Sequence, residues 1–196
     1  PNAPSGTVVP LAQVADLAAR AGAIVVLDEA YVDFAADGGV GLIDSHPNVI
    51  VLRTMSKSYS LAGMRIGFAF AAPAVIGQLE KIKDHYNLNR LSLVAAAAAL
   101  DDIEAMQANA RRICQTRDRL TAGLRALGFQ VWDSQANFVL ARRAAPLALA
   151  LYEGLKRRRI LVRYFATPRL RDCLRITVGT EEQVARLLGE LADLLG

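Results

Sequence analysis

The chain has 196 residues, 53% of them hydrophobic and 21% charged, a composition that is ordinary for a water-soluble globular protein. The net charge of +4 comes from lysines and arginines scattered among acidic residues, so nothing in it indicates a nucleic-acid partner. The two cysteines, Cys114 and Cys173, lack the spacing of metal ligands, no apolar stretch approaches the length of a membrane span, and no signal peptide is visible. We therefore expect a cytoplasmic protein without a metal site or a membrane partner.

The first part of the chain predicts a helix followed by strands. A turn-rich segment over 1–7 (PNAPSGT) precedes a helix over 10–21, where apolar residues recur at helical spacing. Short apolar runs over 23–27 (AIVVL), 49–52 (VIVL) and 66–71 (IGFAFA) predict strands, and the first two are typical of strands buried on both faces, as in a parallel sheet. These two runs end in polar residues, and ligands of open α/β sheets bind beyond the carboxyl ends of the strands.

The rest of the chain predicts helices first and then a mixture of short strands and helices. A helix as long as the one expected over 101–127 often bridges two domains, so we place a domain change near residue 101, with an α+β lobe after it. Thr180 and Gln183 have the spacing of a capping box. The expected segments are helices over 75–86, 92–100 and 101–127, strands over 130–132, 136–141, 160–164 and 173–178, and helices over 145–158 and 181–195.

Lys57 follows the second apolar run in a setting of hydroxyl groups. An amine held among small polar groups is what Schiff-base chemistry needs. Hydroxyls beside it, together with the guanidinium of Arg65, would suit a dianionic phosphate, and the nearest hydroxyls are those of Thr54 and Ser56. Taken alone, a solvated turn is the simpler interpretation of these residues.

Asp28 ends the first apolar run, three residues before Tyr31. A carboxylate that faces a pyridine nitrogen keeps it protonated, and the protonated ring withdraws electrons from a developing carbanion. Tyr31 is placed to donate to the phenolic oxygen of such a ring, and the side-chain amide of Asn2 is able to bind a ligand oxygen. The structural alternatives are a helix cap for Asp28 and a local turn for Asn2.

Several motifs occur in an order that resembles the fold-type I pyridoxal-phosphate aminotransferases, in the subfamily of histidinol-phosphate aminotransferase. The motifs are PNAPSGT, VVLDEAYVDF, RTMSKSYSLAGMRIGF, SQANFVLAR, ILVRYF and CLRITVGT. The resemblance covers essentially the whole chain. It implies an α/β fold in which residues 1–100 are the C-terminal part of the large cofactor-binding domain and residues 101–196 are a bridging helix and the small domain.

The resemblance also implies roles for individual residues. Lys57 would hold pyridoxal 5'-phosphate as a Schiff base and, once displaced by substrate, move a proton between the α-carbon and the C4′ carbon. Asp28 would pair with the ring nitrogen, and Tyr31 with the ring oxygen. The remaining roles are the cofactor phosphate for Thr54, Ser56 and Arg65, the ring oxygen for Asn2, the substrate α-carboxylate for Arg175, the substrate phosphate for Arg163, and the substrate side of the pocket for Asn137. Ala3 departs from the family pattern, in which an asparagine often precedes the second proline, so Asn2 is the only amide in this loop.

The activity that the resemblance implies is amino transfer between L-histidinol phosphate and 2-oxoglutarate in histidine biosynthesis, by a homodimer. Alternatives are an aromatic-amino-acid aminotransferase, a threonine-phosphate decarboxylase and an aminotransferase-like sensor domain of a transcription regulator. The family's phosphate-binding glycine-rich turn, its ring-stacking aromatic residue and a tyrosine from the neighbouring subunit belong to an N-terminal half that these residues do not include. We therefore expect a fragment of a longer protein, which by itself binds the cofactor weakly and is poorly active.

Overall fold

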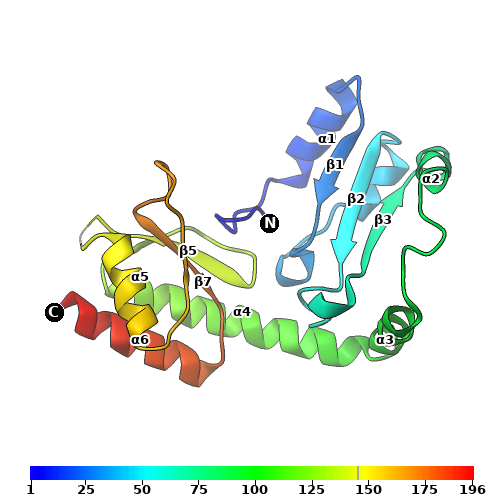
Figure 1. Ribbon diagram of the computed structural model, residues 1–196. Coiled ribbons are helices and arrows are strands. Elements are labelled where there is room, and N and C mark those ends of the chain that lie inside the picture. Colours follow the sequence, from blue (N-terminus) through cyan, green and yellow to red (C-terminus); the bar gives the residue numbers. More distant parts are fainter. Residues whose placement is uncertain (145) are drawn as a thin grey trace. The chain divides into compact units, whose positions relative to one another are not determined.

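The computed structural model describes residues 1–144 and 146–196, which divide into two compact units. Unit 1 consists of Pro1 and Val9–Ala110, and unit 2 consists of Asn2–Val8 and Arg111–Gly196. Each unit contains one sheet, and the elements are labelled in Figure 1. The division after Ala110 falls inside the long helix α4 (Ile103–Ala126), in the same helical part of the chain as the domain change expected near residue 101.

The sheet of unit 1 is mixed. Its order is β1 (Val25–Asp28), β2 (Val49–Thr54) and β3 (Gly67–Ala71). β1 and β2 are parallel and are joined through two 3-10 helices, η1 (Val32–Phe34) and η2 (Val40–Asp44). β3 is antiparallel to β2, because the connection between them contains only η3 (Ala62–Met64) and no long crossover helix of the kind that parallel strands require.

The two faces of β1 are unequally buried. Helix α1 (Leu11–Arg20) contributes Ala18 to a buried cluster with Val49 and Val51 of β2. Successive residues of a strand point to opposite faces, and on the other face Val26 and Leu52 are 56% and 37% exposed. The expectation that the first strand is buried on both faces was therefore wrong, because β1 alternates between half-buried and exposed residues.

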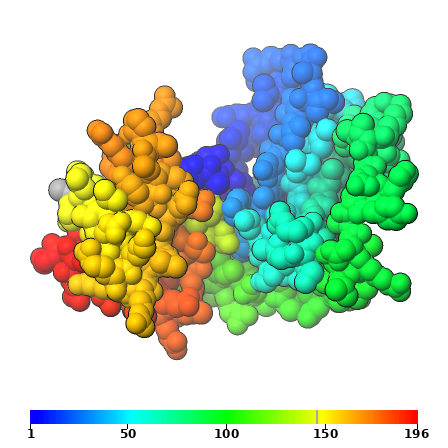
Figure 2. Space-filling model, viewed as in Figure 1, coloured from blue at the N-terminus to red at the C-terminus, as the bar shows by residue number. Residues whose placement is uncertain are grey.

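Two further helices complete unit 1. α2 (Pro73–Glu80) begins with a proline in its first turn and ends earlier than the helix expected over 75–86. α3 (Arg90–Asp101) is capped by Asn89, whose side chain accepts a hydrogen bond from the backbone of Ser92 at 2.9 Å. The segment from α2 through α3 lies at the surface of unit 1 (green in Figure 2), where the apolar side chains of Ile82, Tyr86 and Leu91 are exposed.

The sheet of unit 2 is antiparallel. Its order is β4 (Gln130–Val131), β5 (Phe138–Arg142), β7 (Cys173–Thr177) and β6 (Arg163–Tyr164). Its other helices are α5 (Ala148–Arg157) and α6 (Glu181–Leu195). Residue 145, the expected start of α5, lies outside the described residues. The capping box of Thr180 and Gln183 at the start of α6 is confirmed.

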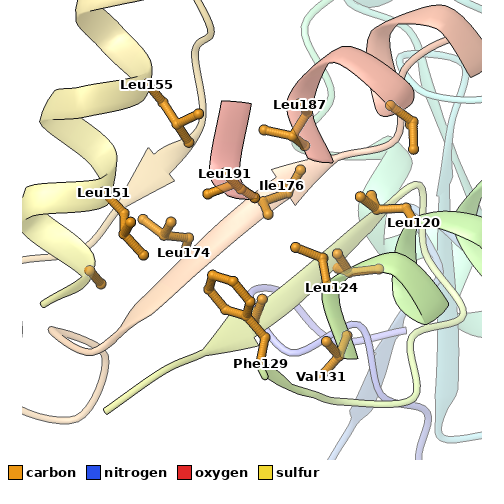
Figure 3. Close-up of a cluster of buried hydrophobic side chains, with 14 of the residues drawn as sticks. Leu120, Leu124, Phe129, Val131, Leu151, Leu155, Leu174, Ile176, Leu187 and Leu191 are labelled. Atoms are coloured by element: carbon orange, nitrogen blue, oxygen red, sulfur yellow. The ribbon is translucent and has the colours of Figure 1, made fainter. Parts of the chain in front are cut away.

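A closed hydrophobic core holds unit 2 together. Figure 3 shows side chains of α4, α5 and α6 pointing toward one another and toward β7. The members that are 0% exposed include Leu120, Leu124, Leu155, Leu174 and Leu191. Every residue of this core lies after residue 110, so unit 2 buries its apolar surface without help from unit 1.

Candidate active site

Polar residues gather at one edge of the unit 1 sheet. Asp28 and Thr54 are the last residues of β1 and β2, and parallel strands end at the same edge. Their side chains share one face, because Asp28 pairs with Leu52, two residues before Thr54. β3 runs in the opposite direction and begins at this edge, where Gly67 pairs with Thr54. Arg65 comes just before β3, so the antiparallel direction of β3 brings it to the same edge.

Lys57 and Tyr31 meet beyond this edge. The Lys57 Nζ atom lies 5.2 Å from the centroid of the Tyr31 ring, a distance at which a cation is attracted to the ring face. Both residues are half-buried. Tyr31 follows β1 and Lys57 follows β2, so this contact joins the two segments in which the sequence placed its main candidates.

The loop that carries Lys57 is held by its own backbone. The N–H of Met55 donates to the carbonyl oxygen of Ile66 at 3.1 Å, and the N–H of Leu61 donates to that of Met55 at 3.0 Å. The Met55 side chain is fully buried in a cluster with Ile66 and Ala96 of α3. Lys57 is thus presented by a loop whose base is packed against a helix.

The carboxylate and hydroxyl candidates differ in what they still offer to a ligand. Oδ1 of Asp28 accepts from the N–H of Ala30 at 2.9 Å, while its Oδ2 makes no bond to the described part of the chain. The Thr54 hydroxyl donates to the carbonyl oxygen of Ile66 at 3.1 Å and accepts from the N–H of Ser56 at 3.0 Å. Thr54 thus shapes the loop, and its role toward a phosphate stays a prediction.

Ser56 and Arg65 keep donors for an anion. The Ser56 hydroxyl is half-buried and makes no hydrogen bond within the described ranges. Arg65 is exposed, and one guanidinium nitrogen donates to the carbonyl oxygen of Ala62 at 3.0 Å, which leaves its other donors for a ligand. Its backbone has a φ of 58°, in the left-handed region, where few residues other than glycine are found.

A partly buried ion pair at this edge was not predicted from the sequence. Glu29, only 5% exposed, follows Asp28, and Arg53 precedes Thr54. The Arg53 Nε donates to Glu29 Oε2 at 2.9 Å, and the other Glu29 oxygen accepts from the N–H of Gly39. The pair ties the ends of β1 and β2 together. No local pattern reveals it, because its members are 24 residues apart.

Unit 2 presents two arginines side by side. Arg163 of β6 and Arg175 of β7 are direct partners in the antiparallel register. Their guanidinium carbons lie 5.5 Å and 5.9 Å from the centroid of Phe165, and that of Arg175 lies 5.0 Å from the centroid of Phe138. Within residues 1–144 and 146–196 neither forms an ion pair with a carboxylate. Like charges opposite each other are unfavourable, so the arrangement suits an anion.

The two asparagine candidates also lie in unit 2. Asn137 precedes β5 and is half-buried. Its backbone carbonyl oxygen accepts a hydrogen bond from the N–H of Val178 at 2.9 Å. The Asn2 side chain donates to the hydroxyl of Ser5 at 2.9 Å, and its backbone closes a turn with Gly6. This contact is the one that a local turn would give, and a cofactor role for Asn2 stays a prediction. Within unit 1 the structure brings Lys57 and Tyr31 together at the edge that carries Asp28 and Arg65. Within unit 2 it pairs Arg163 with Arg175.

Neither a metal cluster nor a membrane helix is found in the described ranges. Across residues 1–144 and 146–196, no three histidine, cysteine, aspartate or glutamate side chains gather where they would bind a metal ion. Over the same residues, no helix has the length and apolar character needed to cross a membrane.

Comparison with known proteins places this arrangement in a family. The family described as aminotransferase class I and II matches residues 1–191. Histidinol-phosphate aminotransferase 1 of a Nostoc species is 47% identical over 195 residues, which cover 100% of the chain and 55% of that protein. Histidinol-phosphate aminotransferase of Geobacter sulfurreducens is 46% identical over 194 residues, covering 99% and 55%.

A solved structure shows the same fold. The crystal structure of histidinol-phosphate aminotransferase from Sinorhizobium meliloti in complex with pyridoxal-5'-phosphate has a TM-score of 0.89 and 30% identity, covering 100% of the chain and 55% of that protein. The chain thus spans about half the length of the relatives that it matches. With an α/β fold of fold type I and a family match over nearly all its residues, the chain belongs to the aminotransferase class I and II family.

Proposed function

We propose that the full-length protein containing this chain transfers an amino group between L-histidinol phosphate and 2-oxoglutarate, with pyridoxal 5'-phosphate as its cofactor. The observation that carries the proposal is the Lys57 amine lying 5.2 Å from the Tyr31 ring centroid, at the sheet edge that also carries Asp28 and Arg65. Relatives that are 46–47% identical to the chain bear the name of this enzyme, which supports the choice of reaction.

The side chains of unit 1 match the cofactor group by group. Lys57 offers an amine for the aldehyde, Asp28 a free carboxylate oxygen for the ring nitrogen, and Tyr31 a phenol for the ring oxygen. Ser56 and Arg65 offer donors for the phosphate. When bound, the cofactor supplies an electron sink for the carbanion formed at the substrate α-carbon.

The chain's own residues perform the remaining tasks. Asp28 would pair with the ring nitrogen and keep it protonated, which is the state that withdraws electrons. Lys57, as a free amine, would remove the proton of the substrate α-carbon and donate it to the C4′ carbon of the cofactor. Tyr31 lies against this amine and restricts where it points.

The arginine pair of unit 2 would allow one pocket to bind two different substrates. Histidinol phosphate presents a phosphate, whereas glutamate and 2-oxoglutarate present carboxylates, and a guanidinium binds both through paired hydrogen bonds. We assign Arg175 to the α-carboxylate and Arg163 to the phosphate or distal carboxylate, with Asn137 on the same side of the substrate. An aromatic-amino-acid aminotransferase would instead need an apolar surface where Arg163 stands.

We further propose a homodimer in the cytoplasm. Exposed apolar side chains after α2 and at the start of α3, namely Ile82, Tyr86 and Leu91, offer surface that an assembly would bury. The two cysteines are free thiols, which suits a reducing compartment. Sedimentation of the full-length protein at a single protomer mass would contradict the dimer.

The proposed function is tested with the purified full-length protein by measuring the formation of glutamate from 2-oxoglutarate, with histidinol phosphate or phenylalanine as the amino donor. We expect the phosphate substrate to react faster, and Lys57→Ala to abolish the reaction while Lys81→Ala, at an exposed lysine, leaves it unchanged. Arg163→Gln should raise the KM for histidinol phosphate about tenfold or more, the effect of losing a charge-assisted hydrogen bond. A faster reaction with phenylalanine, or carbon dioxide release from threonine phosphate, would contradict the assignment. The 196-residue chain by itself is expected to react poorly.

A further inference from the structure

A buried hydroxyl stands directly beside Lys57. The side chain of Ser58 is 2% exposed, and its hydroxyl donates to Oδ2 of Asp33. Asp33 lies in η1, two residues after Tyr31. The bond therefore connects the segment that carries Tyr31 to the segment that carries Lys57, across 25 residues of sequence.

Both ends of this bond are anchored. Phe34, next to Asp33, is 3% exposed, and its N–H donates to the carbonyl oxygen of Tyr31 at 3.1 Å. On the other side the N–H of Ser60 donates to the carbonyl oxygen of Lys57 at 3.1 Å. Asp33 thus lies inside a turn that closes on Tyr31, and Ser58 lies inside a turn that closes on Lys57, so the bond between them links the two turns.

The surroundings of Asp33 make the bond stronger than one in water. Burial raises the pKa of the neighbouring Tyr59, and the negative charge of Asp33 raises it further, against the opposing effect of Arg53. The bond itself is sheltered from water, since Ser58 is 2% exposed and Asp33 is half-buried, and a hydrogen bond to a carboxylate in a partly desolvated setting is stronger than one between neutral groups.

We propose that Asp33 is a positioning residue that, through Ser58, holds the Lys57 amine against Tyr31. The inference rests on the proposed function, since it concerns how Lys57 meets the cofactor aldehyde. Asp33 touches neither the cofactor nor the substrate in this account. Because a reacting group that is misplaced by a small distance loses rate more than binding, loss of the bond should slow bond formation at Lys57 without weakening cofactor affinity to the same degree.

The test follows the rate at which Lys57 of the full-length protein forms a borohydride-reducible bond with added pyridoxal phosphate, over a range of cofactor concentrations. We expect Asp33→Ala and Ser58→Ala each to lower the maximal rate about tenfold, as expected for one hydrogen bond to a charged group. Asp33→Asn keeps an oxygen acceptor for Ser58 and should retain most of the rate. Asp37→Ala, at an exposed carboxylate of the same segment, is the matched control and should leave the rate unchanged.

The double variant separates positioning from general loosening. If Asp33 acts through Ser58, Asp33→Ala and Ser58→Ala combined should lose about as much rate as either alone, whereas two independent effects would multiply to about a hundredfold. Melting temperatures measured in parallel show whether each variant is folded. If Ser58→Ala is unfolded, the rates of Asp33→Ala and Asp33→Asn alone decide whether the hydrogen bond to Ser58 positions Lys57. A wild-type rate in folded Asp33→Ala, or multiplied effects, would overturn the inference alone. Failure of the wild-type protein to form the bond would overturn the proposed function and the inference with it.

Discussion

The two sheets of the molecule are stabilised in different ways. In unit 2, leucines of three helices and of β7 are completely buried against one another. In unit 1, the face that carries Asp28 and Thr54 leaves Val26 and Leu52 exposed. The proposed cofactor residues therefore lie on the sheet with the smaller core, and their geometry depends less on apolar burial.

In unit 1, an ion pair and a side-chain hydrogen bond connect the segments that carry the candidate residues. The ion pair of Glu29 and Arg53 joins the ends of β1 and β2, and the bond between Asp33 and Ser58 joins the segments that follow them. Such directional bonds fix distances more narrowly than packing of flexible apolar side chains does. Unit 2 is thus held together by its apolar core, whereas partly buried polar pairs connect the segments of unit 1 that carry the candidate residues.

The largest effect is expected in the core of unit 2. Leu174→Ala should destabilise unit 2 by about 3 kcal/mol, because it removes a fully buried side chain and leaves a cavity. Val26→Ala, on the exposed face of β1, should change the free energy of unfolding by less than about 0.5 kcal/mol. Urea denaturation of the chain measures both, and equal losses would contradict the difference between the two sheets.

The next effect concerns the ion pair of unit 1. Arg53→Met should cost about 2 kcal/mol, since it leaves the Glu29 carboxylate buried without its partner, and partial exposure of Arg53 keeps the loss below that of a fully buried pair. Adding Glu29→Gln to Arg53→Met should recover part of this loss. Denaturation followed by a probe in unit 1 provides the measurement, and a further loss in the double variant would argue against a buried charge as the cause.

A smaller effect is expected at the start of α6. Thr180→Ala removes the acceptor for the N–H of Gln183 and should cost about 1 kcal/mol in unit 2. Gln183→Ala removes only the reciprocal bond to the backbone of Thr180 and should cost less. Thermal unfolding of unit 2 would rank the two variants, and the reverse order would contradict the capping geometry.

The smallest effect appears only at alkaline pH. Burial, followed by the hydrogen bond to Asp172 and its charge, raises the pKa of Cys173 from 9.0 to about 11. The folded protein thus keeps this proton to a higher pH than the unfolded chain, so the free energy of unfolding should fall between about pH 9 and 11. Comparing the pH dependence of unfolding in wild type and Cys173→Ala tests this, and an identical slope in both would show that Cys173 is not responsible.

The sequence predicted the centre of the site better than its supports. Lys57, Tyr31 and Asp28 end or follow strand-like runs, so their position at the carboxyl edge of a sheet was foreseeable, while their roles stay predictions. The pairs Glu29–Arg53 and Asp33–Ser58 were not, because they join residues 24 and 25 positions apart without any local period.

In the fold, too, local features were predicted better than contacts between distant segments. Helix α6 with its cap lies where the apolar spacing and Thr180 indicated. The direction of β3, which brings Arg65 to the site, was not specified by the apolar runs, because it depends on how the chain connects β2 to β3. The exposure of β1 was mispredicted for a related reason: an apolar run does not reveal whether a second layer covers it.

The most direct test of the account identifies the lysine that binds the cofactor. The chain has four lysines, Lys57, Lys81, Lys83 and Lys156. The full-length protein would be incubated with pyridoxal phosphate, reduced with borohydride, digested and analysed by mass spectrometry. The account predicts one equivalent of label on Lys57, and none after substitution of Lys57 by alanine. Label on another lysine, or none on the wild-type protein, would contradict it.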